Sequence, residues 1–341
     1  MTTLRFSEDE LMRSHDYASP QVENGQRLHG GFDTNGTYIP PRFVRRGPAI
    51  DAWTDALRAR GGDLLAADAS LLGGLRYPNE AQMKLMLQEG LGQTFWNTLT
   101  ITGHIEARGR ILAEMTFPDF QDVIEEDISE MAIGHLNGGL LVAHGLDEGG
   151  EPARGIGGHD VMWFVLRDLA FGEVDYPEPE VPENIARPEG DLVLPPEIPE
   201  GHARLLSFLL NLLLIEFRAE LGFSMTESLL RDPELFTERR DEANHAAEIV
   251  ERIRRDEEVH VSSLRLFLGE LRSIHFKGRR GAGVPGHELV DPIWEGIVRW
   301  ATVDQPKLAA EQQKKLLSDR ILAHPEGERI LARFHALEEA A

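Results

Sequence analysis

The stretch "ERIRRDEEVHVSSLRLFLGEL", residues Glu251 to Leu271, predicts a helix that has one core-facing apolar side and one solvent-facing side. In a helix, residues three or four positions apart lie on the same face. One such face, extended one turn upstream, comprises Ile249, Ile253, Glu257, His260, Leu264, Phe267 and Leu271. Glu257 and His260 are therefore predicted to lie within a core-facing stripe. The solvated side is expected to carry Arg254, Arg255, Asp256 and Glu258.

A carboxylate at Glu257 needs a partner if it lies in the core. Burying an unpaired carboxylate costs roughly several kcal/mol, so a cation or several hydrogen bonds must offset the loss of water. His260, one turn farther on, offers one hydrogen bond, and a divalent metal ion can bind both side chains. A metal site is the main prediction, and a structural salt bridge in the core is the alternative.

The preceding helix offers acids that can face Glu257. The stretch "LLSFLLNLLLIEFRAELGFSMTE", Leu205 to Glu227, is apolar almost all round, which predicts a buried helix. Its acids are expensive to bury unless they have a partner. We choose Glu220 as the one that faces Glu257, with Glu216 and Glu227 as alternatives. An ion pair between Glu220 and an arginine is equally compatible with the sequence.

An acid on one long helix, followed by Glu257-x-x-His260 on the next, resembles the second half of a ferritin-like diiron carboxylate protein. This family includes ferritins, rubrerythrins, the ribonucleotide reductase small subunit and bacterial multicomponent monooxygenases. Its members form a four-helix bundle whose inward Glu and His residues hold two iron or manganese ions. The resemblance implies that Glu220, Glu257 and His260 are metal ligands.

The first helix pair departs from the family pattern because it has no second Glu-x-x-His. The nearest substitutes are Glu106, Glu130 and His135. Glu106 and Glu130 lie at about the same height if the chain reverses direction near Pro118. His135 is five residues from Glu130, a spacing that requires a π-bulge. Further candidates are Glu89, His104, Glu126 and His144. A single metal or a metal-free bundle also remains open.

Composition excludes several other kinds of site. The chain has 341 residues and a formal net charge of −23, which argues against nucleic acid as a partner. It has no cysteine, which excludes disulfides, thiolate zinc sites, iron–sulfur clusters and cysteine nucleophiles. The first residues lack the apolar stretch of a secretory signal, and the apolar run Leu205 to Phe217 is too short to span a bilayer. We therefore expect a cytoplasmic protein without a membrane partner.

The organisation is predicted to be mostly α-helical, with a ferritin-like four-helix bundle over residues 79–275. Residues 1–78 read as an irregular segment with short helices, and 276–341 as helices packed on the bundle. The Pro-rich segment 173–201 is expected to lie as a strap across the bundle. The helices are expected at 51–60, 66–72, 79–115, 119–145, 159–171, 202–230, 232–273, 287–301, 305–323 and 326–339.

Two polar stretches outside these helices permit more than one interpretation. "GIGGHD", Gly155 to Asp160, is interpreted as a flexible helix start in which His159 and Asp160 cap the helix, with an acid–base pair as the alternative. The segment Tyr38 to Arg46 is interpreted as a surface loop. Binding of an anionic substrate through Arg42, Arg45 and Arg46 is the alternative.

The resemblance implies a non-haem dinuclear-iron oxidoreductase that activates dioxygen to oxidise a small organic substrate. Two iron ions are the expected cofactor, with manganese as the other metal the family uses. The chain is longer than a bare storage bundle, which favours substrate oxidation over iron storage. An electron-donor protein and a homodimer are left open. The competing hypotheses are a helical scaffold with a buried polar network and a metal-dependent hydrolase.

Overall fold

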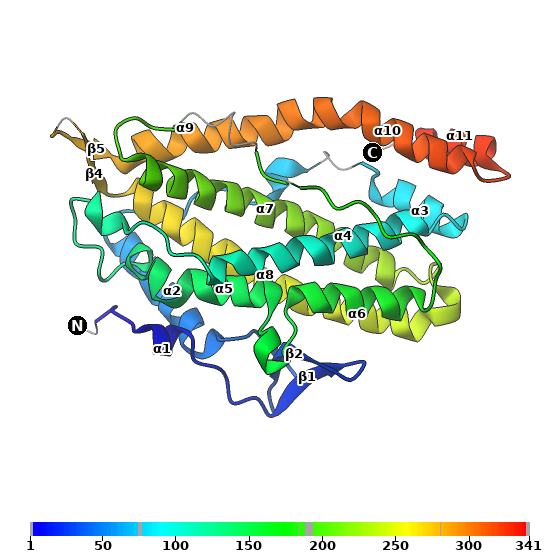
Figure 1. Cartoon of the computed structure of the whole chain (residues 1–341), viewed down its shortest axis with the longest axis horizontal. Coiled ribbons are helices and arrows are strands. Elements are labelled where there is room, and N and C mark those ends of the chain that lie inside the picture. The colour runs from blue at the N-terminus through cyan, green and yellow to red at the C-terminus, as the bar shows by residue number, and fades with distance from the viewer. Residues whose placement is uncertain (1–2, 74–76, 184, 188–193, 280, 339–341) are drawn as a thin grey trace.

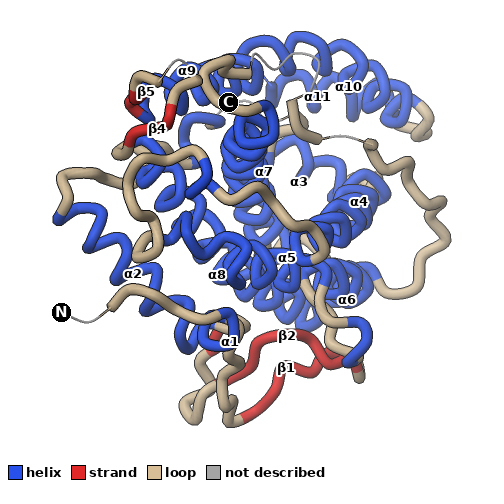
Figure 2. Tube along the Cα trace, turned by 60° about the vertical axis from the view of Figure 1, so that its left-hand side comes forward, coloured by secondary structure: helices blue, strands red, loops and turns tan. Residues whose placement is uncertain are grey.

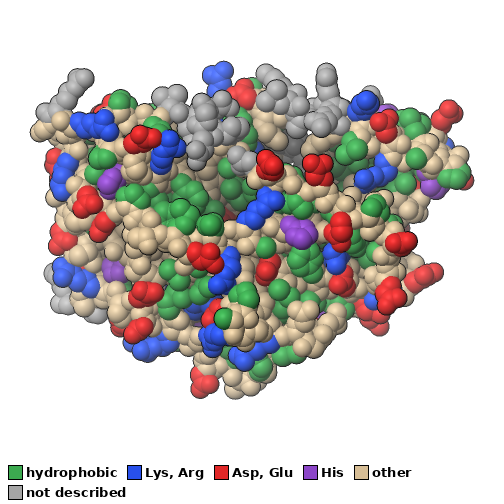
Figure 3. All heavy atoms as spheres, in the orientation of Figure 1, with side chains coloured by type: hydrophobic (Ala, Val, Ile, Leu, Met, Phe, Trp, Pro, Cys, Tyr) green, Lys and Arg blue, Asp and Glu red, His purple; other side chains and the backbone are tan. Residues whose placement is uncertain are grey.

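The computed structural model describes residues 3–73, 77–183, 185–187, 194–279 and 281–338. The protein is mostly helical, as expected, and its few strands are short. Figures 1 and 2 show long helices that run side by side, with a small sheet at one edge. On the face shown in Figure 3, acidic, basic and apolar side chains are interspersed, despite the acidic composition. Within the described residues, every helix is too short or too polar to cross a membrane.

Five helices surround the centre of the molecule: α4 (Gln93–Gly109), α5 (Leu141–Gly149), α6 (His159–Phe171), α7 (Glu200–Arg231) and α8 (Arg240–Arg272). Helix α7 packs along α8, α8 along α6, and α6 along α4 (Figure 1). Helices α5 and α6 follow each other in the chain and together occupy one side of this bundle. Of the expected bounds, those of α6 match, and α8 begins at Arg240 instead of Asp232.

The apolar interior is divided by a polar layer. On α8, the residues from Ala243 to Ile253 belong to one apolar cluster, and those from Val259 to Leu271 belong to another. Between these two runs lie Asp256 and Glu257, both buried. The sequence-based prediction that Asp256 faces solvent is wrong, because β2 and α6 cover this side of α8. Polar groups buried this deeply need partners, so this layer is the candidate location of a functional site.

The N-terminal segment is more ordered than the sequence suggested. Strands β1 (Ser19–Glu23), β2 (Gln26–Phe32) and β3 (Tyr38–Ile39) form an antiparallel sheet in that order. Helix α1 (Glu8–Leu11) precedes the sheet, and α2 (Phe43–Ala59) follows it. Helix α2 starts well before the predicted residue 51. Arg42 and Arg46 are consequently buried and do not lie on a surface loop.

The region 79–158 differs most from the predicted pair of long helices. Helix α3 (Glu80–Gln88) ends before Gly90, whose φ of +78° interrupts the helix ahead of α4. Residues 114–131 contain no α-helix, and a π-helical turn, Leu136–Leu140, leads into α5. Helix α5 then continues to Gly149, into the stretch 145–158 predicted as a loop. Asp147 and Glu148 are therefore helical residues.

The remaining elements lie around this centre. The Pro-rich segment lies beside α4 and α7 at Glu183 and Ile185, because Arg108 on α4 and Arg218 on α7 donate hydrogen bonds to the carbonyl groups of these two residues. Residues 184 and 188–193 of the predicted strap lie outside the described residues. A hairpin of β4 (His275–Lys277) and β5 (Gly283–Pro285) follows α8. Helices α9 (Gly286–Arg299), α10 (Gln305–Leu322) and α11 (Gly327–Glu338) complete the described chain. Helix α9 packs against α7 and α8, whereas α10 and α11 pack against each other and cover α3 (Figure 1).

Candidate metal centre

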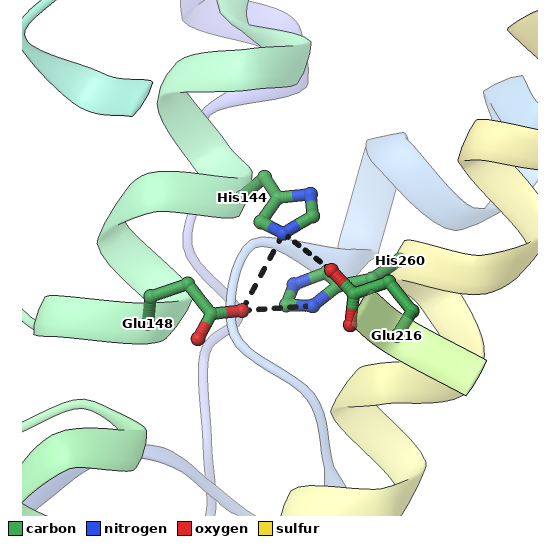
Figure 4. Close-up of side chains that lie close together, drawn as sticks. All are labelled: His144, Glu148, Glu216 and His260. Atoms are coloured by element: carbon green, nitrogen blue, oxygen red, sulfur yellow. Dashed lines mark ion pairs between the residues drawn. The ribbon is translucent and has the colours of Figure 1, made fainter. Parts of the chain in front are cut away.

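Four side chains from three helices meet in the polar layer (Figure 4). His144 and Glu148 come from α5, Glu216 from α7 and His260 from α8. His144 Nε2 lies 3.1 Å from Glu216 Oε1 and 3.4 Å from Glu148 Oε1. His260 Nδ1 lies 3.2 Å from the same oxygen of Glu148. The four ligand atoms all lie within 4.8 Å of one another, which is the proximity that one metal ion requires.

A second group of four adjoins the first and shares Glu148 with it. Its other members are Glu106 on α4, His159 at the start of α6 and Glu257 on α8. His159 Nδ1 lies 3.1 Å from Glu257 Oε1 and 3.5 Å from Glu106 Oε2. Glu257 also connects the groups, because its other oxygen lies 2.8 Å from His260 Nδ1. We call the seven residues the Glu/His cluster: Glu106, His144, Glu148, His159, Glu216, Glu257 and His260.

The turn between α5 and α6 brings Glu148 and His159 together. Gly150 has φ +62°, and a Cβ atom on it would lie 2.5 Å from the backbone nitrogen of Gly158, so the two ends of the turn nearly touch. Strand β2 supports this turn, because the backbone N–H of His29 donates to the carbonyl of Gly157 at 2.8 Å. The N-terminal sheet thus fixes Gly157, two residues before His159.

Helix α5 can approach α4 closely because Gly109 has no side chain. A Cβ atom on Gly109 would lie 2.5 Å from Cγ of Glu148. This contact is shorter than real Cβ contacts, so any larger residue would displace the Glu148 side chain. The glycine is therefore part of what places Glu148 between the two ligand groups.

Buried carboxylates orient two of the histidines. Asp256 lies 3.3 Å from His159 Nε2 and also accepts hydrogen bonds from Tyr38 and His29. Asp147 lies 3.2 Å from His260 Nε2. Metal-binding histidines commonly donate their second ring N–H to a carboxylate, which fixes the tautomer and points the other nitrogen at the metal. Both rings therefore direct Nδ1 into the cluster.

Two arginines balance the charge of Asp147. Arg46 donates to it at 2.6 Å, and Arg42 donates to its other oxygen. These positive charges hold the pKa of Asp147 well below its usual range, although burial acts in the opposite direction. Asp147 is thus an ionised hydrogen-bond acceptor for His260. The segment around Arg42 supports the cluster from inside the protein.

The cluster contains more negative charge than its surroundings offset. Burial, followed by the charge of Glu148, raises the pKa of Glu106 well above its usual range. Burial and then the charge of Glu257 raise the pKa of Glu216. Burial alone would lower the pKa of His159 and His260, but the Glu257 carboxylate beside both rings raises it well above its usual value. Without a bound cation, these glutamates and histidines therefore retain protons, and bound cations would displace those protons.

The donor set fits two divalent metal ions. Four ionised glutamates carry four negative charges, which two divalent ions neutralise while the imidazoles remain neutral ligands. His159 Nδ1 is buried and has no hydrogen-bond partner among the described residues, because its close contacts to carboxylates lack hydrogen-bond geometry. A buried imidazole nitrogen that faces carboxylates without a hydrogen bond to any of them is in the position of a metal ligand.

The structure gathers some of the predicted ligands and not others. Glu106, Glu257 and His260 belong to the cluster. On α7, the alternative Glu216 belongs to it instead of Glu220, which lies one turn farther along and is exposed. Glu227 forms ion pairs with Arg231 and Arg254 and is not part of the cluster.

Glu130 and His135 lie outside the cluster. Glu130 is on a surface turn, where its side chain accepts a hydrogen bond from Thr3. His135 uses both ring nitrogens on backbone groups, at 2.8 Å from the carbonyl of Met131 and 3.1 Å from the N–H of Phe6. The helix predicted over 119–145 does not form, so the spacing of these two residues does not place them on one face, and the structure does not bring them to the cluster.

Of the further candidates, only His144 belongs to the cluster. His104 is exposed and contacts the Phe164 ring. Glu89 pairs with Arg329 and Arg333, and Glu126 pairs with His275.

Sequence reasoning did not place Glu148 and His159 among the candidate metal-binding residues. His144 and Glu148 are four residues apart, a spacing that places both on one helix face, but in the reverse order to Glu-x-x-His. Recognising that "HGLDE" continues the helix would have found the pair. The sequence gives less indication of the position of His159. This residue is the first of its helix, and the turn before it is held in place by contacts with distant parts of the chain.

No known protein-family model, curated protein or solved structure matches this chain.

Proposed function

We propose that the protein is a dinuclear metal oxidoreductase, with iron as its metal, that activates dioxygen to oxidise a small organic substrate. The observation that carries this proposal is the sharing of Glu148 and Glu257 between two adjoining ligand groups. A single-ion site has no use for a second group of ligands around the same carboxylates. Two glutamates that can bridge, two that can bind one ion each and three imidazoles instead suit a pair of ions.

The ligand chemistry favours iron, with manganese as the alternative. Imidazole nitrogen suits iron, and carboxylate oxygen suits iron and manganese, whereas calcium and magnesium prefer all-oxygen sites. Inward Glu and His residues on facing helices also resemble the ligands of ferritin-like diiron carboxylate bundles, which supports this choice. When bound, two iron ions supply the redox chemistry that reduces dioxygen.

The residues of the chain hold and shield this chemistry. Asp256 and Asp147 fix the orientation of His159 and His260, so these side chains need little rearrangement when metal ions bind. The apolar clusters on either side of the polar layer exclude water along α7 and α8. A cavity of about 230 Å³ reaches Glu106, His144, Glu148 and Glu216 from the side of the Pro-rich segment. This cavity gives dioxygen and a substrate a route to the cluster.

Oxygen insertion into a C–H bond requires a further reductant. Dioxygen accepts four electrons, two from the substrate bond and two from an external donor, and two protons complete the water that is released. We therefore propose that an electron-donor protein or a small reductant acts with this enzyme.

Oxygen uptake tests the proposal. Protein reconstituted anaerobically with Fe(II) is mixed with dioxygen, and uptake is compared with that of two variants. The wild type and Glu258→Ala, an exposed position on α8, are expected to consume oxygen faster than free Fe(II), whereas Glu148→Ala is not. Equal uptake by all three would contradict an oxidoreductase. Hydrolytic activity that persists without oxygen would instead favour a metal-dependent hydrolase, and absence of any bound metal would favour the scaffold.

A further inference from the structure

A second cavity, larger than the one that reaches the cluster, lies beside it. It has a volume of about 540 Å³ and lies between α4, α7, the Pro-rich segment and the turn that begins at Trp300. Its volume is in the range of small-molecule sites. It shares part of its wall with the smaller cavity that reaches the cluster. The shared lining residues are Ile105, Glu106, Ile185, Ala186, Ile215 and Ala219.

The wall of the larger cavity is mostly apolar. Thr98 and Thr102 line it from α4, but their hydroxyl groups donate to helix carbonyls at 3.0 and 2.9 Å. They therefore offer little free hydrogen-bonding capacity. Phe223 and Gly222 continue the apolar wall along α7. Such a surface suits a hydrocarbon, because moving a hydrocarbon out of water lowers the free energy.

Among the described residues that line this cavity, Arg218 is the one with a cationic side chain. Its Nη1 donates to the carbonyl of Ile185 at 2.9 Å, and its guanidinium carbon lies 5.0 Å from the centre of the Trp300 ring. No described carboxylate forms an ion pair with it. Burial lowers its pKa, although a guanidinium still keeps its charge at neutral pH. By contrast, Arg42 and Arg46, which are almost fully buried beside the cluster, both have Asp147 as their partner.

We propose that the larger cavity binds a substrate with an apolar body and one carboxylate group, which Arg218 binds. A guanidinium has five N–H donors, and Arg218 uses one on the strap carbonyl, so donors remain for a bidentate carboxylate contact. The Trp300 ring holds the guanidinium from one face. The proposal rests on the proposed function only for what happens to the substrate, because the binding itself needs no metal.

The layout also fixes which part of the substrate meets the cluster. The carboxylate is at Arg218, and the apolar wall shared by the two cavities leads to Glu106. The reacting bond is therefore a C–H bond of the hydrocarbon part, remote from the acid group. That bond breaks, a C–O bond forms with one atom of dioxygen, and the other atom leaves as water with two electrons from the external donor and two protons.

Calorimetric titration of the metal-free protein tests the binding. Decanoate carries the proposed groups, and decanol is its neutral match. The wild type is expected to bind decanoate more tightly than decanol. Arg218→Gln should weaken decanoate binding by roughly 10- to 100-fold, the value of a charged hydrogen-bonded contact, and leave decanol unchanged. Arg231→Gln, which removes an exposed arginine from the same helix, should change neither.

A second variant protects the test against misfolding of the first. Ala219→Phe should fill the shared wall and weaken both ligands while Arg218 stays in place. Equal affinity for decanoate and decanol in the wild type, or equal decanoate affinity in the wild type and Arg218→Gln, would overturn the proposal. Because no metal is present, Arg218-dependent binding survives even if the protein never binds iron. Conversely, a dinuclear iron site can exist without this binding.

Discussion

The two halves of the bundle that meet at the Glu/His cluster differ in regularity. Helices α7 and α8 are unbroken over 32 and 33 residues. The opposite half consists of α4, α5 and α6, with 17, 9 and 13 residues, separated by turns. The regular half supplies Glu216, Glu257 and His260 to the cluster. The interrupted half supplies Glu106, His144, Glu148 and His159. Regular helices thus provide the frame, and irregular backbone adds ligands that one straight helix cannot present together.

The halves also support each other. Asp256 on α8, in the regular half, lies beside His159 of the interrupted half. Asp147 on α5, in the interrupted half, lies beside His260 of the regular half. Each half therefore orients a histidine of the other, so the cluster geometry depends on correct packing between them.

The largest effect is expected where the halves share a ligand. Glu148→Ala removes a carboxylate from both ligand groups, so we expect bound iron to fall from two ions per chain to none. Iron content of chelator-free protein measures this directly. Two ions retained in the variant would show that Glu148 does not join the groups.

Removing one histidine from each half should have a smaller, matched effect. His159→Ala removes the one imidazole of its group, and His260→Ala removes one of the two imidazoles of the other group, so each variant is expected to keep one iron ion per chain. Glu258→Ala, exposed on α8 next to Glu257, serves as the control and should keep two. If His159→Ala keeps both ions while His260→Ala keeps one, the interrupted half does not supply the second site.

A still smaller effect is expected from the support between the halves. Asp256→Asn removes the charged acceptor beside His159, and loss of such a partner typically lowers metal affinity by roughly 10- to 100-fold. The ion in the group of His144 and Glu216 should keep its affinity. Titration with Fe(II) would resolve two unequal sites in the variant. Asp241→Asn, an exposed position at the start of α8, should leave both affinities unchanged.

The smallest effect on metal content is expected for Glu130 and His135, the two predicted ligands that lie outside the Glu/His cluster. Glu130→Gln should change neither metal content nor stability by more than about 0.5 kcal/mol, because the side chain is exposed. His135→Ala should keep both ions but lower the free energy of unfolding by about 1–3 kcal/mol. The reason is that its ring packs on Trp53 and bonds to the Phe6 backbone. Metal loss in either variant would contradict the assignment of ligands.

The regular half was predictable from sequence because helical period and burial act locally there. The apolar stripe of Glu251 to Leu271 placed Glu257 and His260 correctly, with both residues buried. Whether Glu216 or Glu220 faces Glu257 depends on how far α7 is shifted along its axis relative to α8. That shift is set by the connection between the helices, where the chain leaves α7 at Arg231 and enters α8 only at Arg240.

The interrupted half was not predictable from the same signals. Its backbone is shaped by close approaches such as Gly109 against Glu148 and Gly150 against Gly158, which involve partners distant in space or across a turn. Asp256 was assigned to solvent because its position on the helix wheel is outside the stripe. Strand β2 and the start of α6 cover that side, and the sequence carries no local sign of this contact.

Anomalous diffraction at the iron edge, on crystals of protein loaded anaerobically with Fe(II), would locate each bound iron ion in the Glu/His cluster. Two peaks per chain are expected. One should lie among His144, Glu148, Glu216 and His260, and the other among Glu106, Glu148, His159 and Glu257. A single peak, or none within reach of Glu148, would contradict a dinuclear centre shared between the two halves.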